Sequence, residues 1–283
     1  MCRVFQTSQG IVLLTGGLLL LALLLAGLAI ADNGVGDSLR DGRHALISIR
    51  GGDRNLFVRG ASGGEALQLT NDAASEGDPA WSADGARIAF SSDRSGNLEI
   101  WTIAATGREP RQVTDSEAPD LQPTWSPDGR QIVFVSVRDG TSNLFIAHLD
   151  DGRVEQLTDL PEIVAYPAWS PDGRTIAFTI VGEQDGAVAS QIAVLPVTGG
   201  DLTQLTADTG LSHQAAWSPD GSAIAYTWTP PDTVPDERSA IAVVPASGGD
   251  RELLTDDDWG DLDPSWSPDG RRIVFVSTRD GLR

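Results

Sequence analysis

Lysine is absent from this chain of 283 residues, and all 20 of its basic residues are arginine. Without lysine the chain can form neither a catalytic Schiff base nor the lysine-bearing loop of a P-loop nucleotidase, so both classes are excluded. Cysteine is almost absent too: Cys2 stands alone, which leaves no disulfide and no cysteine-based metal site within one chain. The formal net charge of −20 argues against binding to duplex nucleic acid or to anionic lipid.

Long apolar runs are missing except at the start of the chain. Residues 11–31 form an uncharged apolar run that is long enough to span a bilayer as a helix. The run ends in Ala29-Ile30-Ala31, a pattern that signal peptidase cleaves. We therefore expect residues 1–31 to be a signal peptide or an uncleaved signal anchor, and the remainder to be exported as a periplasmic or secreted protein. Residues 32–40 are then a linker or a degenerate first strand, and residues 41–283 a folded domain.

A repeated phrase organises that domain. Its fixed point is a tryptophan that recurs at intervals of 44 to 49 residues. The five copies are Trp81, Trp125, Trp169, Trp217 and Trp266. A period in the forties with several short strands per repeat is typical of a β-propeller. A turn such as Ser126-Pro127-Asp128-Gly129 follows each tryptophan, with proline presetting one φ angle and glycine accepting a positive one.

Each repeat contains three further predicted strands. The strand after the turn alternates its apolar residues, as at Ile132 and Phe134, and the next resembles Asn143-Leu144-Phe145-Ile146. A turn with glycine then leads to a Gln-Leu-Thr strand such as residues 156–158. One repeat buries too little surface to fold alone, so we expect four-stranded antiparallel blades that cover one another's faces. Residue types that recur at five equivalent positions are interpreted as scaffold rather than as a catalytic site.

These motifs carry a family resemblance. With W-S-P-D-G, the I-x-F strand, Q-L-T and the S-x-R-D-G phrases that end at Gly140 and Gly281, residues 41–283 resemble the TolB-like, WD-type β-propellers. The resemblance implies an all-β propeller of six blades and a binding role in the periplasm or outside the cell. TolB itself carries an additional N-terminal α/β domain, and similar propellers precede the hydrolase domain of prolyl oligopeptidases. We expect neither domain in this sequence.

The number of blades is set by the two ends of the repeat array. Asp41-Gly42-Arg43 matches the end of the S-P-D-G-R turn, so a degenerate first unit is expected to start near Gly34. The last unit has its first two strands and lacks the other two. We predict a six-bladed ring with an incomplete last blade. A five-bladed closure and a longer protein clipped at Arg283 are the alternatives.

The loops between blades are the expected functional region. Strands of a blade alternate in direction, so these loops gather on one rim beside the central channel, and function often lies on loops held by a rigid scaffold. The loops are residues 71–78, 115–122, 159–166, 207–214 and 256–263, each with acidic residues and none with arginine. The residues expected at the channel mouth are Asp78, Gln122, Tyr166, Gln214 and Asp263. Such a rim is either solvated only or attracts cationic peptides, basic protein surfaces or Ca²⁺.

The last of these loops holds the densest carboxylate cluster. Asp256, Asp258 and Asp261 are candidate Ca²⁺ ligands, although the spacing and distal glutamate of an EF-hand are missing. No other cofactor is expected. Trp259 lies in this loop, and Trp228 lies at the longest of the loops that join the second and third strands of a blade. Both are candidate exposed aromatics that could anchor a peptide or a sugar, and packing within the loops is the alternative.

Catalytic motifs are weak in this sequence. Residues 60–64 match G-x-S-x-G, but they fall in a hairpin rather than in the strand-to-helix turn that a nucleophile requires. His44 and His148 fall on strands, where structural roles are expected. His213 lies on the acidic rim beside Gln214 and is a candidate base or metal ligand, without a second histidine or an obvious nucleophile.

We therefore predict an exported, non-enzymatic binding module. Its acidic rim is expected to hold a protein or peptide partner, with a basic surface as the natural complement, and to bind no nucleic acid. Any contact with the membrane is expected through residues 11–31 alone. The alternatives are a hydrolase or lyase of the envelope that acts on polysaccharide or peptide through residues such as His213, and a propeller fragment of a longer peptidase-like protein.

Overall fold

The computed structural model describes residues 39–40, 42–50, 53–60, 62–138, 140–184, 186–231, 233 and 238–279. Every regular element among these residues is a β-strand. In this part of the chain no helix has the length and apolar character needed to cross a bilayer. The predicted signal segment and apolar helix, residues 1–31, and most of the predicted linker lie outside the described residues.

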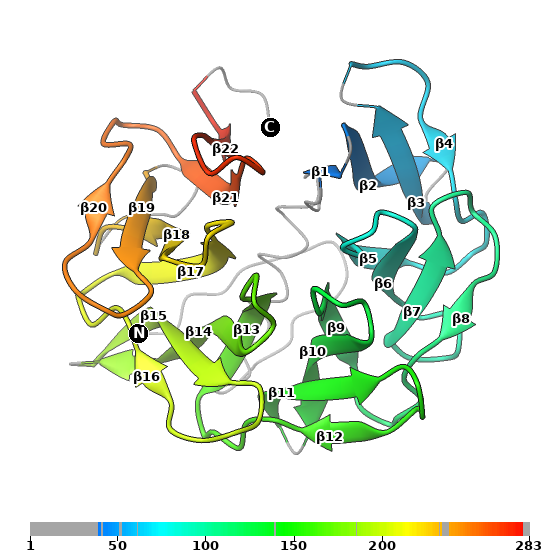
Figure 1. Ribbon diagram of the computed structural model, residues 1–283, viewed down its shortest axis with the longest axis horizontal. Helices are drawn as coiled ribbons and strands as arrows, with labels where there is room; N and C mark the ends of the chain where they lie inside the picture. The colour runs from blue at the N-terminus through cyan, green and yellow to red at the C-terminus, as the bar shows by residue number, and fades with distance from the viewer. Residues whose placement is uncertain are drawn as a thin grey trace, which may run out of the picture. The chain divides into compact units, whose positions relative to one another are not determined.

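The strands form consecutive antiparallel sets, which we call blades 1 to 6 (Figure 1). Blade 1 consists of β1 (Leu39–Arg40), β2 (Arg43–Arg50), β3 (Asp53–Gly60) and β4 (Leu67–Gln68). Blade 2 consists of β5 (Glu76–Trp81), β6 (Arg87–Ser92), β7 (Glu99–Ala104) and β8 (Arg111–Gln112). Blade 3 consists of β9 (Asp120–Trp125), β10 (Gln131–Arg138), β11 (Thr141–His148) and β12 (Val154–Gln156).

The remaining blades follow the same order. Blade 4 consists of β13 (Ile163–Trp169), β14 (Thr175–Gln184), β15 (Ala187–Pro196) and β16 (Thr203–Gln204). Blade 5 consists of β17 (Leu211–Trp217), β18 (Ala223–Thr229), β19 (Ala240–Pro245) and β20 (Glu252–Leu253). Blade 6 is described by two strands, β21 (Asp261–Trp266) and β22 (Ile273–Ser277). The predicted all-β propeller of four-stranded antiparallel sheets is confirmed.

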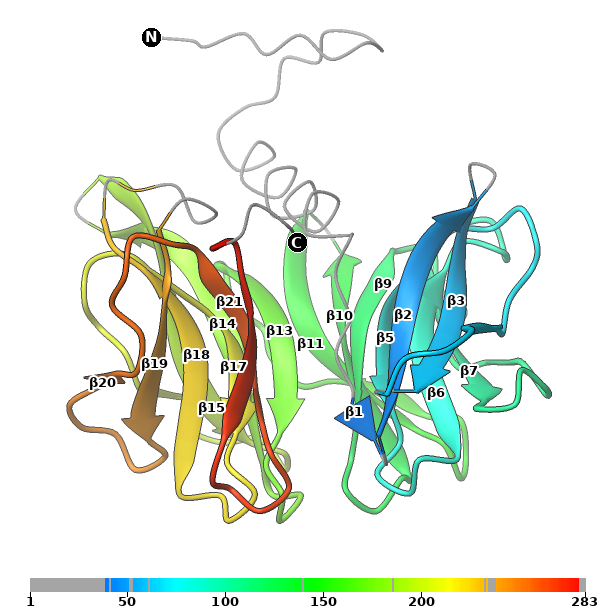
Figure 2. The same ribbon diagram turned by 90° about the horizontal axis from the view of Figure 1, so that it is seen from above.

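The first strands of successive blades face one another across the interior. In the view of Figure 1, β5, β9, β13, β17 and β21 lie innermost around a common axis, and Figure 2 shows the strands running along that axis. Each of these strands also contacts strands of the preceding blade, as β13 contacts β9, β10 and β11. The loops that lead into the first strands therefore open at one end of the channel, as the alternation of strand direction predicts.

The repeated Trp-Ser-Pro-Asp-Gly phrase is a packing and turn device. In blade 3, Ser126 Oγ donates a hydrogen bond of 2.6 Å to Asp128 Oδ1 and accepts one of 2.9 Å from the backbone N–H of Gln131. Gly129 has a φ of 70°, a conformation that costs a side chain strain, and the matching glycines of the other blades have φ between 68° and 73°. The match includes Gly42, so blade 1 carries the end of the same turn.

The tryptophans link neighbouring blades. The indole Nε1–H of Trp125 donates a hydrogen bond of 3.1 Å to the carbonyl oxygen of Ala80, which precedes the tryptophan of blade 2. The same bond runs from Trp169 to Thr124, from Trp217 to Ala168 and from Trp266 to Ala216. The ring itself lies among the apolar side chains of the preceding blade. Because both the ring and its N–H are used at the four junctions from blades 2 and 3 to blades 5 and 6, tryptophan recurs at this position.

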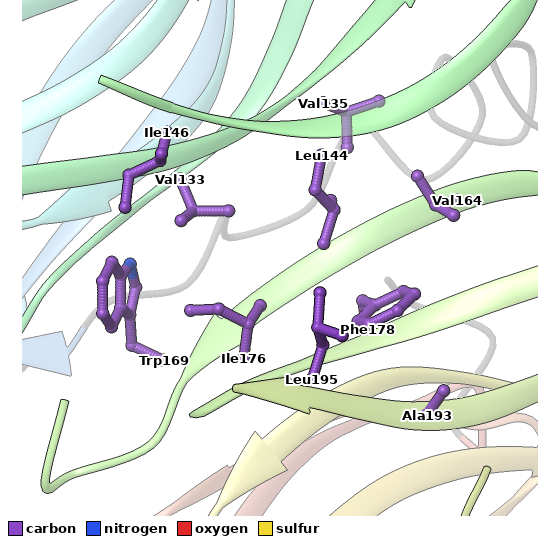
Figure 3. Packing of buried hydrophobic residues seen from close by; sticks show 10 residues of the cluster. All are labelled: Val133, Val135, Leu144, Ile146, Val164, Trp169, Ile176, Phe178, Ala193 and Leu195. Carbon is purple, nitrogen blue, oxygen red and sulfur yellow. The ribbon is translucent and has the colours of Figure 1, made fainter. Parts of the chain in front are cut away.

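Apolar side chains fill the spaces between blades. Figure 3 shows the seam of blades 3 and 4, where Val133, Leu144 and Ile146 face Trp169, Ile176 and Leu195. Burying each such side chain stabilises the fold by about 1.5–3 kcal/mol. The isoleucine and the aromatic residue of the second strand are fully buried in blades 2 to 5, as Ile176 and Phe178 are in blade 4.

Candidate functional site

The five residues predicted at the channel mouth share one unusual backbone conformation. Asp78, Gln122, Tyr166, Gln214 and Asp263 have φ between 49° and 59° and are five of the six non-glycine residues with positive φ in the described chain. At each of them the pairing of the first two strands of the blade shifts register. A left-handed residue at a bulge redirects its side chain. Because blades 2 to 6 all have this bulge, it belongs to the scaffold. Only the type of side chain at this position differs from blade to blade.

Hydrogen bonds join three of these residues from blade to blade. Asp78 Oδ2 accepts hydrogen bonds from Ser91 Oγ, at 3.0 Å, and from the backbone N–H of Gln122, at 3.3 Å. Gln122 Oε1 in turn accepts a bond of 2.7 Å from the backbone N–H of Tyr166. Each side chain therefore bonds the backbone of the next blade, and the mouth is a fixed surface at Asp78, Gln122 and Tyr166.

A second group of contacts covers the other side of the mouth. His213 Nδ1 lies 2.9 Å from Gln214 Oε1, and the side-chain amide of Gln214 donates a hydrogen bond to Asp263 Oδ1. Thr227 Oγ1 donates to Gln214 Oε1 and accepts from the backbone N–H of Asp263, both at 3.2 Å. The rings of Tyr166 and His213 are 6.2 Å apart, which joins this group to the first.

The mouth has an acidic electrostatic environment. Burial raises the pKa of the Tyr166 phenol well above its usual range, and the carboxylates of Asp263 and Asp78 raise it further. Both carboxylates therefore act on the same phenol, although they belong to blades 6 and 2. Burial also raises the pKa of Asp78, against the effect of its hydrogen bonds from Gln122 and Ser91. A cationic group placed here would relieve both unfavourable charge environments.

The acidic rim is smaller than the sequence predicted. Three of its carboxylates, Glu76, Asp120 and Asp261, are at most 1% exposed and lie in the seams between blades rather than on the rim. Glu76 shows why: its Oε1 accepts a hydrogen bond of 2.9 Å from Arg94, and its Oε2 one of 2.8 Å from Thr70 Oγ1. The expectation of an exposed acidic rim is therefore wrong at these three positions, because their carboxylates are buried.

Asp120 is the most perturbed of these buried carboxylates. Its pKa is raised to about 6, first by burial and then by the neighbouring carboxylate of Glu99. The hydroxyls of Ser136 and Thr114 and the guanidinium of Arg138 oppose the rise. The Asp120 carboxyl lies in the seam between blades 2 and 3. Among the described residues, no recorded contact joins it to a residue of the channel mouth.

The threonine of the Gln-Leu-Thr strand makes the same buried polar contact in several blades. Thr158 Oγ1 donates to Asn143 Oδ1 at 2.8 Å and accepts from the backbone N–H of Leu144 at 2.9 Å. Thr114 with Glu99 and Thr206 with Gln191 repeat the arrangement. Sequence reasoning treated this threonine only as part of a strand. Its recurrence together with a polar residue of the third strand, Glu99, Asn143 or Gln191, was the signal for a buried polar seam.

The two candidate aromatics lie in different surroundings. Trp259 is 43% exposed, in the loop that leads to blade 6. Trp228 lies in β18 rather than in the following loop, packs on the core of blades 4 and 5, and has the guanidinium of Arg251 4.0 Å from its ring centre. The description of Trp228 as a loop aromatic is therefore wrong, since β18 extends to Thr229.

The candidate calcium ligands are not gathered in one place. Asp256 and Asp258 are exposed, whereas Asp261 is fully buried at the start of β21. Across the residues that the structure describes, no group of three His, Cys, Asp or Glu side chains is placed to hold a metal ion. Asp257 is instead paired with Arg279. The calcium prediction thus rests on the sequence pattern alone.

Comparison with known proteins supports the fold. Residues 104–230 match the family model described as the TolB beta propeller domain. No curated protein sequence matches this chain. The resemblance to TolB-like propellers predicted from the sequence is confirmed by this match and by the structural neighbours below.

Three solved structures illustrate the likeness. A protein assigned as TolB from Agrobacterium tumefaciens superposes with a TM-score of 0.68 at 24% identity, covering 82% of this chain and 86% of that one. TolB from Acinetobacter baumannii gives 0.67 at 22% identity, covering 88% and 62%. An oligogalacturonate lyase from Vibrio parahaemolyticus gives 0.57 at 15% identity, covering 85% and 84%. At these identities the likeness is one of fold.

Proposed function

We propose that this chain is an exported binding propeller whose channel mouth holds a cationic segment of a protein or peptide partner. The observation that carries the proposal is that Asp78, Tyr166 and Asp263 hold equivalent left-handed positions of three blades at the mouth, where both carboxylates raise the pKa of the Tyr166 phenol. Two half-buried carboxylates and an aromatic ring at one channel mouth offer a guanidinium or ammonium group both ion pairing and a ring face. The likeness to TolB propellers supports a protein partner.

The preorganised side chains of the channel mouth also support this proposal. The mouth side chains are held by hydrogen bonds to the next blade, so little conformational freedom is lost when a ligand binds. The net charge of −20 adds long-range attraction that accelerates the encounter with a basic partner and weakens as salt rises. The net charge thus attracts a basic partner from a distance, and the fixed side chains of the mouth bind it locally.

The proposal includes the setting of the protein. Residues 1–31 supply the export signal, as a cleaved peptide or as an anchor, and the propeller then works in the periplasm or outside the cell. We further propose a six-bladed ring whose last blade is incomplete, supported by the five four-stranded blades and the strand pair β21–β22. Calcium at Asp256, Asp258 and Asp261 is a separate proposal, which titration of the chain with Ca²⁺ tests directly.

A labelled hexa-arginine peptide tests the binding proposal by fluorescence anisotropy. We expect the double variant Asp78→Asn/Asp263→Asn to weaken binding about tenfold, or about 1.4 kcal/mol. The matched control is Asp201→Asn/Asp250→Asn, which removes the same charge from exposed turns between the third and fourth strands of their blades. Equal weakening by both variants would mean that the peptide responds to net charge alone and would contradict a site at the mouth.

A second candidate function is a lyase or hydrolase acting on polysaccharide or peptide. The contact of His213 Nδ1 with Gln214 Oε1 favours it, because an amide oxygen there places the proton on Nδ1 and leaves the lone pair on Nε2. A neutral imidazole in this state is a general base. A screen of polysaccharides and peptides for turnover, repeated with His213→Ala, separates this function from binding: turnover that the variant abolishes favours the enzyme.

A further inference from the structure

The seam between blades 2 and 3 contains two buried carboxylates. Glu99 at the start of β7 and Asp120 at the start of β9 are both 0% exposed. The backbone holds them near one another, because the N–H of Asp120 donates a hydrogen bond of 2.8 Å to the carbonyl oxygen of Leu98. The charge of Glu99 is accordingly one of the causes that raise the pKa of Asp120. Two like charges removed from water are unfavourable unless a positive group compensates them.

The two carboxylates differ in their hydrogen bonds. Glu99 Oε2 accepts a bond of 2.6 Å from Thr114 Oγ1, and its Oε1 accepts one of 2.8 Å from the backbone N–H of Ser116. Among the described residues, neither oxygen of Asp120 has a hydrogen-bond partner. A buried polar group without a partner requires an explanation, and a bound ion is one.

The hydroxyls nearest to Asp120 do not complete it. Thr114 Oγ1 donates its proton to Glu99, so only a lone pair of this oxygen remains for Asp120. Ser136 Oγ accepts a hydrogen bond of 3.0 Å from Arg138 Nε. Both hydroxyls are close enough to lower the pKa of Asp120, but neither makes a hydrogen bond of normal geometry to its carboxylate. The seam is therefore rich in acceptors and poor in donors at this point.

The seam between blades 1 and 2 shows a balanced form of the same arrangement. Its carboxylate is Glu76, which forms an ion pair with Arg94 at 2.9 Å. The side chain of the preceding blade that corresponds to Glu99 is the neutral Asn55, which shares Thr70 Oγ1 with Glu76. One buried carboxylate is thus matched by one guanidinium.

The matching arginine does not reach Asp120. Arg138 and Arg94 occupy the same position, two residues after a serine whose Oγ accepts a hydrogen bond of 3.0 Å from the arginine Nε. The guanidinium of Arg138 lies 4.0 Å from the ring centre of Phe145 and gives no hydrogen bond to Asp120. Because aspartate is one methylene shorter than the glutamate of the other seam, its carboxylate does not meet the guanidinium. This seam has two carboxylates and no directly bonded cation.

We propose that Glu99 and Asp120 bind a divalent metal cation of the Ca²⁺ type in the seam between blades 2 and 3. Asp120 supplies both oxygens, Glu99 supplies a remaining lone pair, and Thr114 supplies its hydroxyl oxygen. Ca²⁺ accepts about six to eight oxygen ligands in a flexible geometry, so water molecules complete the set. A bound water alone would leave both charges in place, and a proton would neutralise only one of them.

This site differs from the two described above. It uses two carboxylates and a hydroxyl, and shares no residue with the exposed pair Asp256 and Asp258. It also lies apart from the channel mouth and does not depend on the function proposed there.

Calorimetric titration of the full chain with Ca²⁺ tests the proposal, in about 0.1 M salt to screen attraction at the surface. We expect saturable binding with a Kd of about 0.1–1 mM, the range of extracellular calcium modules. The double variant Glu99→Gln/Asp120→Asn should weaken this binding at least tenfold. The matched control, Asp256→Asn/Asp258→Asn, removes the same charge from exposed residues and should leave it unchanged.

Competition with protons separates this site from an exposed one. The pKa of Asp120 is about 6, set by burial together with the charges of Glu99 and Arg138. From pH 7 to pH 5 the ionised fraction of Asp120 falls about tenfold, so the affinity for Ca²⁺ should also fall about tenfold. An ordinary exposed aspartate, with a pKa of about 3.9, stays largely ionised over this range.

Hydrogen exchange of the unmodified chain locates the ion even where the double variant folds poorly. Ca²⁺ should slow exchange at the amides of residues 98–100 and 114–120. The equivalent residues 142–144 and 158–164 of the next seam should exchange as before, because Asn143 and Val164 stand there in place of the two carboxylates.

Four results would overturn the proposal. The first is the lack of saturable binding up to about 10 mM Ca²⁺, tenfold above the weakest Kd expected. The second is equal weakening by the two double variants, because binding would then follow net charge. The third is weakening by Asp256→Asn/Asp258→Asn alone, which would place the ion in the loop before blade 6. The fourth is an affinity that is the same at pH 7 and pH 5.

Discussion

Gln122 Oε1 accepts a hydrogen bond of 2.7 Å from the backbone N–H of Tyr166, although the two residues belong to different blades. Gln122 is 9% exposed, so its amide has little contact with water, and the N–H of Tyr166 has its partner in this side chain. The contact ties the shape of the channel mouth to the junction of blades 3 and 4. Scaffold and candidate site therefore share one hydrogen bond.

Replacing Gln122 should therefore cost stability. Gln122→Ala leaves the N–H of Tyr166 without its partner, and we expect the free energy of unfolding to fall by about 1–2 kcal/mol. Urea unfolding followed by tryptophan fluorescence measures the change. Gln68→Ala, at an exposed glutamine of β4, is the control and should have almost no effect. Equal losses in the two variants would show that the contact contributes nothing specific.

The indole hydrogen bonds between blades give a second prediction. Trp169→Phe keeps an aromatic ring in the seam but removes the donor to the carbonyl oxygen of Thr124 and part of the ring area. Because the carbonyl is left without this bond, we expect a loss of about 1–3 kcal/mol. Trp259→Phe, at a residue that is 43% exposed, should change the unfolding midpoint little. A midpoint for Trp169→Phe within error of the unmodified chain would contradict the role assigned to the repeated tryptophans.

The buried carboxylate of Asp120 predicts an unusual pH dependence. Its pKa in the folded chain is about 6, above the value of about 3.9 expected when unfolded. Between these values the folded state binds more protons, so stability is greatest below the lower pKa and falls as pH rises through the higher one. The raised pKa of Glu76, caused mainly by burial, acts in the same direction.

Thermal unfolding at several pH values tests this dependence. From pH 5 to pH 7.5 we expect the contribution of Asp120 to fall by about 1–3 kcal/mol, since one pKa unit corresponds to about 1.4 kcal/mol. Asp120→Asn should flatten the curve and stabilise the chain at pH 7.5. Asp150→Asn, at an exposed position, should leave the curve as it was. A midpoint that rises steadily over this range and ignores Asp120→Asn would rule out the buried carboxylate as its cause.

The scaffold could be predicted because it repeats. Trp125 and its equivalents, the Ser126-Asp128 turn and the alternation of Ile132 with Phe134 are local patterns, and each recurs where the structure needs the same contact. The position of Tyr166 and its four equivalents at the mouth also followed from the repeat, since each stands just before the proline or alanine that opens the tryptophan phrase. Their shared left-handed conformation did not follow, because a residue such as Tyr166 is rarely left-handed outside a bulge.

The charge distribution could not be predicted in the same way. Counting acidic residues in the loops treats Glu76 and Asp261 as exposed, but Glu76 is drawn into a seam by Arg94, from the loop between β6 and β7, and by Thr70, which follows β4. Arg94 is 18 residues away in the sequence, and the geometry of both contacts depends on how the blades stack. Trp228 was placed on a loop for a related reason: the end of β18 is set by its pairing with β17 and β19 rather than by local composition.

The central claim is that the channel mouth, at Tyr166, holds a basic partner. Photo-crosslinking tests it most directly, with benzoyl-phenylalanine placed at position 166 and, as the control, at the exposed position 67. After irradiation with labelled hexa-arginine at about 150 mM salt, where charges beyond about 8 Å are screened, the account predicts an adduct from position 166 and none from position 67. Equal labelling of both positions, or labelling of position 67 alone, would contradict it.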